Sequence, residues 1–182
     1  LARCNYLLER GQPVSDVLFY LGDELGHKPQ QDMPFPAGYK YDYCNTDVLL
    51  NRLSVNNNQI VTPEGISYRL LWLRDSQRML PETLERILTL VEDGAVLLGE
   101  PPEGLATLSG GNKGKEKFTK AVNALWGNGS DHMRRVGKGI VMSDMSIDKA
   151  LEKLKVGADV LVEDVQTGNG GDIDWLHRQT EE

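Results

Sequence analysis

The stretch Pro81-Glu-Thr-Leu-Glu-Arg-Ile-Leu-Thr-Leu-Val-Glu-Asp-Gly-Ala-Val-Leu-Leu98 decides the fold. Its apolar residues Leu84, Ile87, Leu88 and Val91 recur at the i, i+3, i+4, i+7 spacing of one helix face. Proline is favoured at the first position of a helix and glycine just after its end, so the helix begins at Pro81 and ends before Gly94. The apolar run of residues 95–98 follows at once and is typical of a short strand buried on both faces of a sheet.

The same alternation of strand and helix extends to both sides of this stretch. Residues 27–43 carry several prolines and are expected to be irregular. Strands are predicted at residues 17–21, 59–62, 68–73, 95–98, 138–142 and 160–162. Helices are predicted at residues 1–10, 46–53, 81–93, 115–126 and 147–154. This order predicts an α/β fold in three layers, with a mostly parallel sheet flanked by helices, and too few strand–helix units for an eight-stranded barrel.

Composition excludes several classes of function. The chain has 182 residues, a formal net charge of −7 and no basic cluster, which argues against binding to nucleic acid or to anionic membranes. No apolar run approaches the roughly 20 residues that span a bilayer.

The two cysteines, Cys4 and Cys44, do not have the spacing of a zinc motif. Cys4 lies on the apolar side of the first predicted helix, so we expect it to be buried, and a disulfide with Cys44 stays open. Cys44 lacks the flanking glycines of a nucleophile elbow, so it is not expected to be a catalytic nucleophile. The three histidines, His27, His132 and His177, show no metal-ligand spacing.

Acidic residues follow several predicted strands. Asp23 and Glu24, Asp75 and Asp144 come after the strands that end near residues 21, 73 and 142. Ligands gather at the carboxyl ends of parallel strands, so these residues predict a polar site, but acidic residues are also common there because they cap helices. Adjacent side chains such as those of Asp23 and Glu24 point apart and fit poorly as a glycosidase acid–base pair.

Two loops invite a ligand-binding interpretation. Residues 109–115 are rich in glycine and lysine, but they lack the spacing of a Walker loop, so nucleotide binding is not expected. Phe35, Tyr39, Tyr41 and Tyr43 offer rings that either stack on a sugar or pack the loop against its own domain, and we favour packing. The candidate site-rim residues are therefore Asp23, Glu24, Tyr41, Asp42, Tyr43 and Asp75, with no catalytic, cofactor-binding or metal-binding residue assigned.

Five segments together carry a resemblance to a known family. They are Asp16-Val-Leu-Phe-Tyr-Leu-Gly22, Tyr41-Asp-Tyr-Cys-Asn-Thr-Asp-Val-Leu-Leu-Asn51, Tyr68-Arg-Leu-Leu-Trp-Leu73, Met79-Leu-Pro-Glu-Thr-Leu84 and Trp175-Leu-His-Arg178. In this order they resemble the bacterial α-L-rhamnosidases of glycoside hydrolase family 106. None of these motifs is a catalytic signature.

The resemblance implies a place within a long, multidomain hydrolase that cleaves α-L-rhamnosides in polysaccharides. Residues 1–166 resemble its α/β accessory domain, which is flavodoxin-like or class I glutamine amidotransferase-like. Residues 167–182 then form a linker and the start of a truncated β-sandwich domain, with a first strand expected at residues 173–177. The catalytic glutamates and a calcium-assisted site belong to a barrel that precedes this domain.

Further expectations about partners and location follow from the same resemblance. The barrel and the β-sandwich are the expected partners, with rhamnose-containing glycans as a further one, and the parent protein is expected to be periplasmic or secreted. The chain itself is expected to be non-catalytic and to hold no cofactor. Two alternatives stay open, namely a carbohydrate-binding module that uses the loop of residues 39–43 and a flavodoxin- or amidotransferase-like protein that binds a cofactor.

Overall fold

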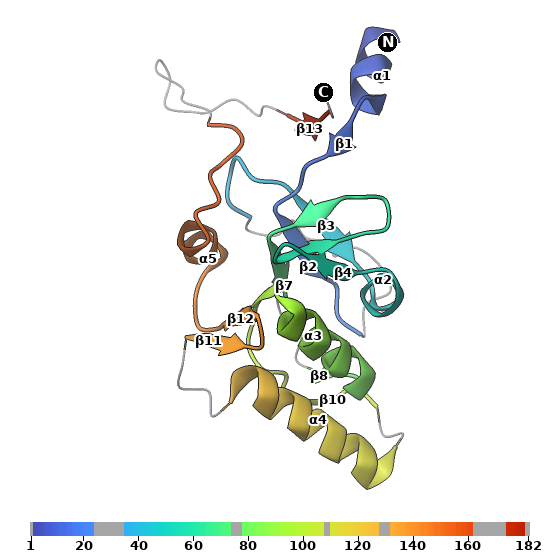
Figure 1. The fold of residues 1–182 in the computed structure, drawn as a ribbon, viewed down its shortest axis with the longest axis vertical. Coiled ribbons are helices and arrows are strands. Elements are labelled where there is room, and N and C mark those ends of the chain that lie inside the picture. Colours follow the sequence, from blue (N-terminus) through green and yellow to red (C-terminus); the bar gives the residue numbers. More distant parts are fainter. Residues whose placement is uncertain are drawn as a thin grey trace.

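The computed structural model of the protein describes residues 2–23, 35–73, 78–107, 110–127, 132–161 and 174–180. Within these residues, the largest sheet has six strands in the order β11-β12-β9-β7-β2-β3 (Figure 1). These strands are β2 (Val17–Tyr20), β3 (Tyr41–Cys44), β7 (Leu70–Trp72), β9 (Val96–Leu98), β11 (Met133–Val136) and β12 (Gly139–Met142). Five of them pair in parallel, and β11 runs antiparallel at one edge.

Helices pack on both faces of this sheet because successive residues of a strand point to opposite sides. Leu18 and Tyr20 belong to a core cluster shared with α2 (Thr46–Asn51), α3 (Pro81–Asp93) and α4 (Gly111–Trp126). Val17 and Phe19 belong to a second cluster, which includes residues of α5 (Ile147–Lys153). The narrower assignment to a flavodoxin-like or amidotransferase-like fold stays a prediction.

The helix predicted from the Pro81 signal is confirmed as α3. Pro81 is its first residue, and Gly94 follows its last residue with a φ of +129°. Leu84, Ile87 and Val91 are fully buried, so the apolar stripe faces the sheet as its spacing predicts.

A smaller antiparallel sheet contains β4 (Ser54–Asn56), β5 (Gln59–Val61) and β6 (Ser67–Tyr68). The single strand predicted at residues 68–73 is wrong, because the chain leaves this sheet at Tyr68 and enters the large sheet at Leu70. The amides of Arg69 and Leu70 both donate to the Asp16 carbonyl, at 2.8 and 3.2 Å. A further parallel pair, β8 (Arg78–Met79) with β10 (Gly104–Leu105), had no signal in the sequence.

The prediction that residues 27–43 are irregular is wrong at their end. Tyr41–Cys44 form β3, which pairs in parallel with β2 at the edge of the large sheet. Phe35 and residues 36–40 belong to no helix or strand, while residues 24–34 lie outside the described residues.

The beginning and the end of the described chain lie side by side. Strand β1 (Gln12–Pro13), which follows α1 (Ala2–Glu9), pairs antiparallel with β13 (Arg178–Gln179) (Figure 1). The strand predicted at residues 173–177 is wrong for the described residues 174–177, since β13 begins only at Arg178. Residues 160 and 161 are likewise not in a strand, and the predicted linker at 167–172 lies outside the described residues.

The prediction for Cys4 is also wrong. Cys4 is exposed and Cys44 is buried, and both are free thiols. Cys44 ends β3 and faces the core shared with α2 and α3.

Among the described residues, no helix has the length and apolar character needed to cross a bilayer.

Candidate functional site

The carboxyl edge of the large sheet is organised around Asp23, which follows β2. Its Oδ1 accepts hydrogen bonds from the Tyr20 hydroxyl at 2.7 Å, from Thr83 Oγ1 at 2.7 Å and from Thr46 Oγ1 at 3.2 Å. Its Oδ2 accepts a hydrogen bond from the Leu80 amide at 2.7 Å. We call Tyr20, Asp23, Thr46, Leu80 and Thr83 the Asp23 network. It joins the end of β2 and the start of α2 to the start of α3.

The Asp23 network performs the task of a helix cap. Leu80 is the N-cap residue of α3 and has no side-chain cap bond of its own, so the carboxylate of Asp23 satisfies a backbone donor there. A negative charge is also favourable at a helix N-terminus. Tyr20 and Thr83 are fully buried, and burial raises the pKa of the Tyr20 hydroxyl, which therefore stays a donor to Asp23. Asp23 is thus a structural acceptor with both oxygens engaged.

The four predicted site-rim residues that the structure describes do not all come together in one site. Along β3, Tyr41 and Tyr43 belong to the face that carries Phe19, whereas Asp42 accepts a hydrogen bond from Tyr68 at 3.1 Å. Burial, followed by the charge of Asp42, raises the pKa of the Tyr68 hydroxyl. Two further predicted rim residues, Glu24 and Asp75, lie outside the described residues.

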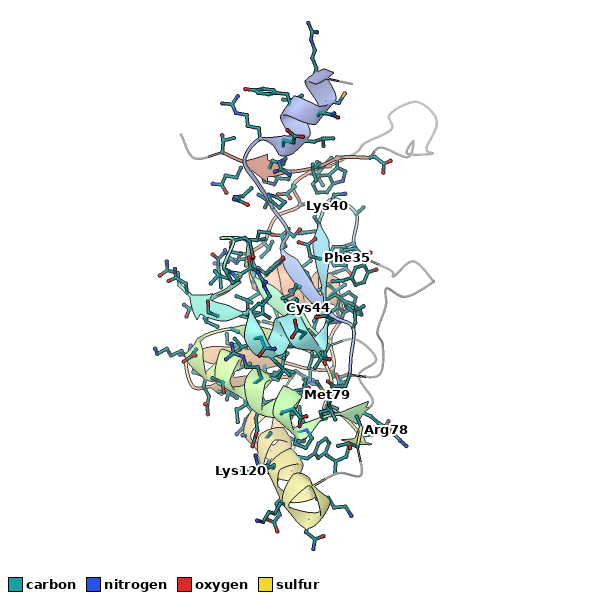
Figure 2. The ribbon with its side chains drawn as sticks, turned by 90° about the vertical axis from the view of Figure 1, so that its right-hand side faces the viewer. Phe35, Lys40, Cys44, Arg78, Met79 and Lys120 are labelled. Carbon is teal, nitrogen blue, oxygen red and sulfur yellow. The ribbon has the colours of Figure 1, made fainter. Side chains whose placement is uncertain are left out.

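The aromatic rings of the predicted loop pack on one another. Tyr41 meets Tyr43 edge-on, with ring centroids 5.4 Å apart, and Tyr43 meets Phe19 at 5.8 Å. Phe35 lies over Tyr41 at 4.5 Å, beside the edge strand (Figure 2). With Trp72, these residues form what we call the aromatic face: Phe19, Phe35, Tyr41, Tyr43 and Trp72. Phe35, Tyr41 and Tyr43 are partly exposed, so this face combines internal packing with accessible ring surface.

At the other end of the same sheet edge, Asp144 follows β12. Its amide donates to the Glu100 carboxylate, and its side chain lies 3.4 Å from His132 Nδ1. The side chains of His132 and Asp144 are 68% and 79% exposed, so this is a solvated surface pair of small energetic weight. Asp144 remains a surface residue with no buried partner in the described part of the chain.

A cluster that the sequence did not indicate lies at the opposite, amino edge of the sheet. Asp16 precedes β2, and its carboxyl interacts electrostatically with Arg69, Asp159 and His177. Burial, and then the Asp159 charge, raises the pKa of Asp16 to about 6. The Nδ1 of His177 lies 3.0 Å from Asp159 Oδ2, although without hydrogen-bond alignment.

The amino-edge cluster holds the C-terminal segment of the chain against the sheet. The His177 carbonyl accepts a hydrogen bond from the Val14 amide at 3.1 Å. Close by, the Lys40 ammonium lies 4.5 Å from the centroid of the Trp175 ring, which is a cation–π distance. Because the residues involved are far apart in the sequence, only the fold could reveal this cluster.

Asp16 and Asp23, the aspartates before and after β2, do not form a carboxylate pair with glycosidase geometry. Asp16 and Asp23 lie beyond opposite ends of β2, whose four residues alone span roughly 13 Å at the rise of an extended strand. Glycosidase carboxyl pairs lie about 5 Å or roughly 6.5–9.5 Å apart. The described residues also lack any group of three or more His, Cys, Asp or Glu side chains able to hold a metal ion.

Comparison with known proteins points to carbohydrate-cleaving enzymes. The model of glycoside hydrolase family 106, described as alpha-L-rhamnosidase, matches residues 1–182. The solved structure of a rhamnosidase from Novosphingobium sp. PP1Y superposes with a TM-score of 0.81 over 98% of this chain, at 28% sequence identity. A protein of Formosa agariphila described as "Putative beta-glucuronidase" is 31% identical over 186 residues.

The chain is much shorter than both relatives. It spans 17% of the rhamnosidase and 14% of the Formosa protein, although these matches cover 98% and 100% of the chain itself. The similarity therefore relates this chain to one small part of each larger protein.

Proposed function

The chain belongs to glycoside hydrolase family 106, the alpha-L-rhamnosidases, and we propose that it serves there as a non-catalytic accessory domain of a longer enzyme. The observation that carries this proposal is the engagement of Asp23. Its two oxygens accept four hydrogen bonds that tie α3 to the sheet, so this acidic group, at the edge where ligands gather in parallel sheets, is a framework residue.

The chain's small share of its relatives supports the same proposal. Because it corresponds to 14% and 17% of their lengths, most of each relative lies outside the matched part and has room for a separate catalytic domain. We propose that the longer enzyme hydrolyses α-L-rhamnosides in polysaccharides. In this proposal, a barrel and a β-sandwich flank the domain, which is flavodoxin- or amidotransferase-like, and the enzyme works in the periplasm or outside the cell.

An activity assay tests the accessory role. The purified 182-residue chain and the longer polypeptide are each incubated with an aryl α-L-rhamnoside, and release of the aryl group is followed by absorbance. We expect turnover by the longer polypeptide and none by the chain alone. Turnover by the chain that is abolished in a Glu24→Gln variant would show that the chain has its own catalytic carboxylate and would refute the proposal.

A second candidate function is carbohydrate binding at the aromatic face, favoured by the partial exposure of Phe35, Tyr41 and Tyr43. Sugar C–H faces pack on aromatic rings, and Trp72 lies beside Phe35 with centroids 6.1 Å apart, so its fluorescence reports on this face. Titration with rhamnose separates the two functions. Rhamnose binding that is lost in Tyr41→Ala would favour the binding module if it is kept in Tyr6→Ala, which changes an exposed tyrosine on α1.

A cofactor-binding protein is the remaining alternative. A flavin-binding domain would retain its yellow cofactor through purification. A colourless preparation that does not quench the fluorescence of added FMN would count against that alternative.

A further inference from the structure

Helix α1 has no packing partner among the described residues. It is eight residues long, and every residue from Arg3 to Arg10 is exposed. Its ribbon projects from one end of the fold in both views (Figures 1 and 2), and Figure 2 shows its side chains spread into open space. Isolated helices shorter than about 12–15 residues are marginal in water, because most helical stability in proteins comes from packing. A helix of this length therefore needs a surface to pack against.

The side chains of α1 show which face that surface would cover. Cys4, Leu7 and Leu8 lie on one side of the helix at the i, i+3, i+4 spacing, and Leu7 and Leu8 are 65% and 51% exposed. We call these three residues the α1 stripe. On the other side, Arg10 lies over the ring of Tyr6, so that side is already polar. An apolar stripe opposite a polar side is typical of a helix that packs on a core.

The C-terminal end of α1 is held in place while the stripe stays open. The guanidinium of Arg178 donates to the carbonyls of Arg10 and Gly11, at 2.7 and 2.5 Å. These carbonyls directly follow the last residue of α1, so Arg178 fixes the point from which α1 projects. The pairing of β1 with β13 follows directly along the chain. The helix is thus anchored to the domain at one end and available at its stripe.

We propose that the α1 stripe packs against another part of the same, longer polypeptide, the part that carries the catalytic domain. This inference rests on the proposed function. The occupant is chosen because the chain spans only 14–17% of its relatives, so most of each relative lies outside it. The stripe is apolar at its centre, and its partner is an apolar groove that accepts two leucines.

Cys4 provides a native probe for this contact. Cys4 is exposed on the stripe, whereas Cys44 is buried and free, so only Cys4 reports on the helix surface. The labelling rate of Cys4 by a maleimide is measured by mass spectrometry of its peptide, in the 182-residue chain and in the longer polypeptide. We expect labelling at least ten-fold slower in the longer polypeptide.

Two variants of the longer polypeptide separate docking from indirect effects. Leu7→Ser with Leu8→Ser is expected to restore fast labelling of Cys4, because it removes the apolar contact. Met133→Ser changes another exposed apolar residue, 43% exposed on β11, and is expected to leave the slow rate unchanged.

Equal labelling rates in the two proteins would overturn the proposal. So would protection of Cys4 in the 182-residue chain that grows with protein concentration, because the stripe would then bind a second copy. Rhamnoside turnover is measured on the same samples, so activity in the chain alone defeats the accessory role whatever the labelling rate is.

Discussion

Replacement of Asp23 by alanine tests the Asp23 network most directly. The change removes the acceptor of four hydrogen bonds, but the Tyr20 and Thr46 hydroxyls can still bond to each other across 2.9 Å. Three donors then lack an acceptor: the Leu80 amide at the start of α3, the fully buried hydroxyl of Thr83, and whichever hydroxyl of the Tyr20–Thr46 pair does not donate to the other. Each buried donor left unpaired costs about 1–3 kcal/mol, so the expected loss is about 3 kcal/mol. That is a large fraction of the roughly 5–15 kcal/mol stability of a domain.

Urea unfolding followed by circular dichroism measures this loss. With a slope of about 2 kcal/mol per molar urea, a loss of that size lowers the midpoint by about 1.5 M. Asp23→Asn keeps one acceptor oxygen and loses the charge, so its midpoint should lie between those of the wild type and Asp23→Ala. A double-mutant cycle with Thr83→Val should give a coupling of about 1 kcal/mol, since the two side chains share a hydrogen bond.

Asp144→Asn is the matched control at the same sheet edge. Its side chain is 79% exposed, and its φ of +51° is one that asparagine tolerates, so a change below about 0.5 kcal/mol is expected. If Asp23→Ala costs no more than this control, Asp23 does not hold α3 to the sheet, and its carboxylate becomes available for another role.

Three further predictions concern other parts of the fold. Burial raises the pKa of the Cys44 thiol to about 12, so at pH 8 the native chain should show one fast-reacting thiol, Cys4, and a second only after unfolding, as a thiol-titration time course will show. Protonated Asp16 contributes stability that is fully present below pH 3.8, the ordinary pKa of an aspartate. This stability is lost as the pH rises through about 6, the pKa of Asp16 in the folded chain. Asp16→Asn should therefore raise the unfolding free energy at pH 7.5 by about 1 kcal/mol, after allowance for solvent screening, and the gain should shrink at pH 5. Gly139→Ala should prevent stable folding or lower the unfolding free energy in urea by more than about 3 kcal/mol, because its Cβ would lie 2.2 Å from the Val91 and Ala95 carbonyl oxygens. Gly157→Ala should lack this steric cost, since a Cβ at Gly157 meets nothing within 4 Å.

The elements that were predicted correctly have local signals. The apolar residues of α3 repeat from one helical turn to the next, and proline and glycine mark its ends, so the sequence alone defines this helix. Strand β2 has four apolar or aromatic residues that are all buried, and an unbroken run of this kind predicts a strand covered on both faces.

The features that were missed depend on distant contacts. Strand β3 contains two tyrosines and an aspartate, which resemble a polar loop until pairing with β2 places them at a sheet edge. The same pairing separates Asp42 from its neighbours Tyr41 and Tyr43. Burial, and then the charge of Asp159, which is distant in sequence, raises the pKa of Asp16, and no spacing rule finds such a pair.

The wrong prediction that Cys4 is buried has a different cause. The apolar pattern of α1 was interpreted correctly as one side of a helix, but the described chain contains no surface for that side. A periodic pattern predicts that a face is to be buried without indicating what buries it.

The central claim is that the carboxylate at the ligand-binding edge of this domain supports the fold and takes no part in the chemistry. The most direct measurement is the kcat of the longer polypeptide for an aryl α-L-rhamnoside, expressed per folded molecule, in the wild type and in Asp23→Asn at a temperature where both are folded. The account predicts a lower melting temperature with kcat changed by less than about two-fold, which corresponds to less than about 0.5 kcal/mol. A kcat at least a hundred-fold lower with an unchanged melting temperature would contradict it.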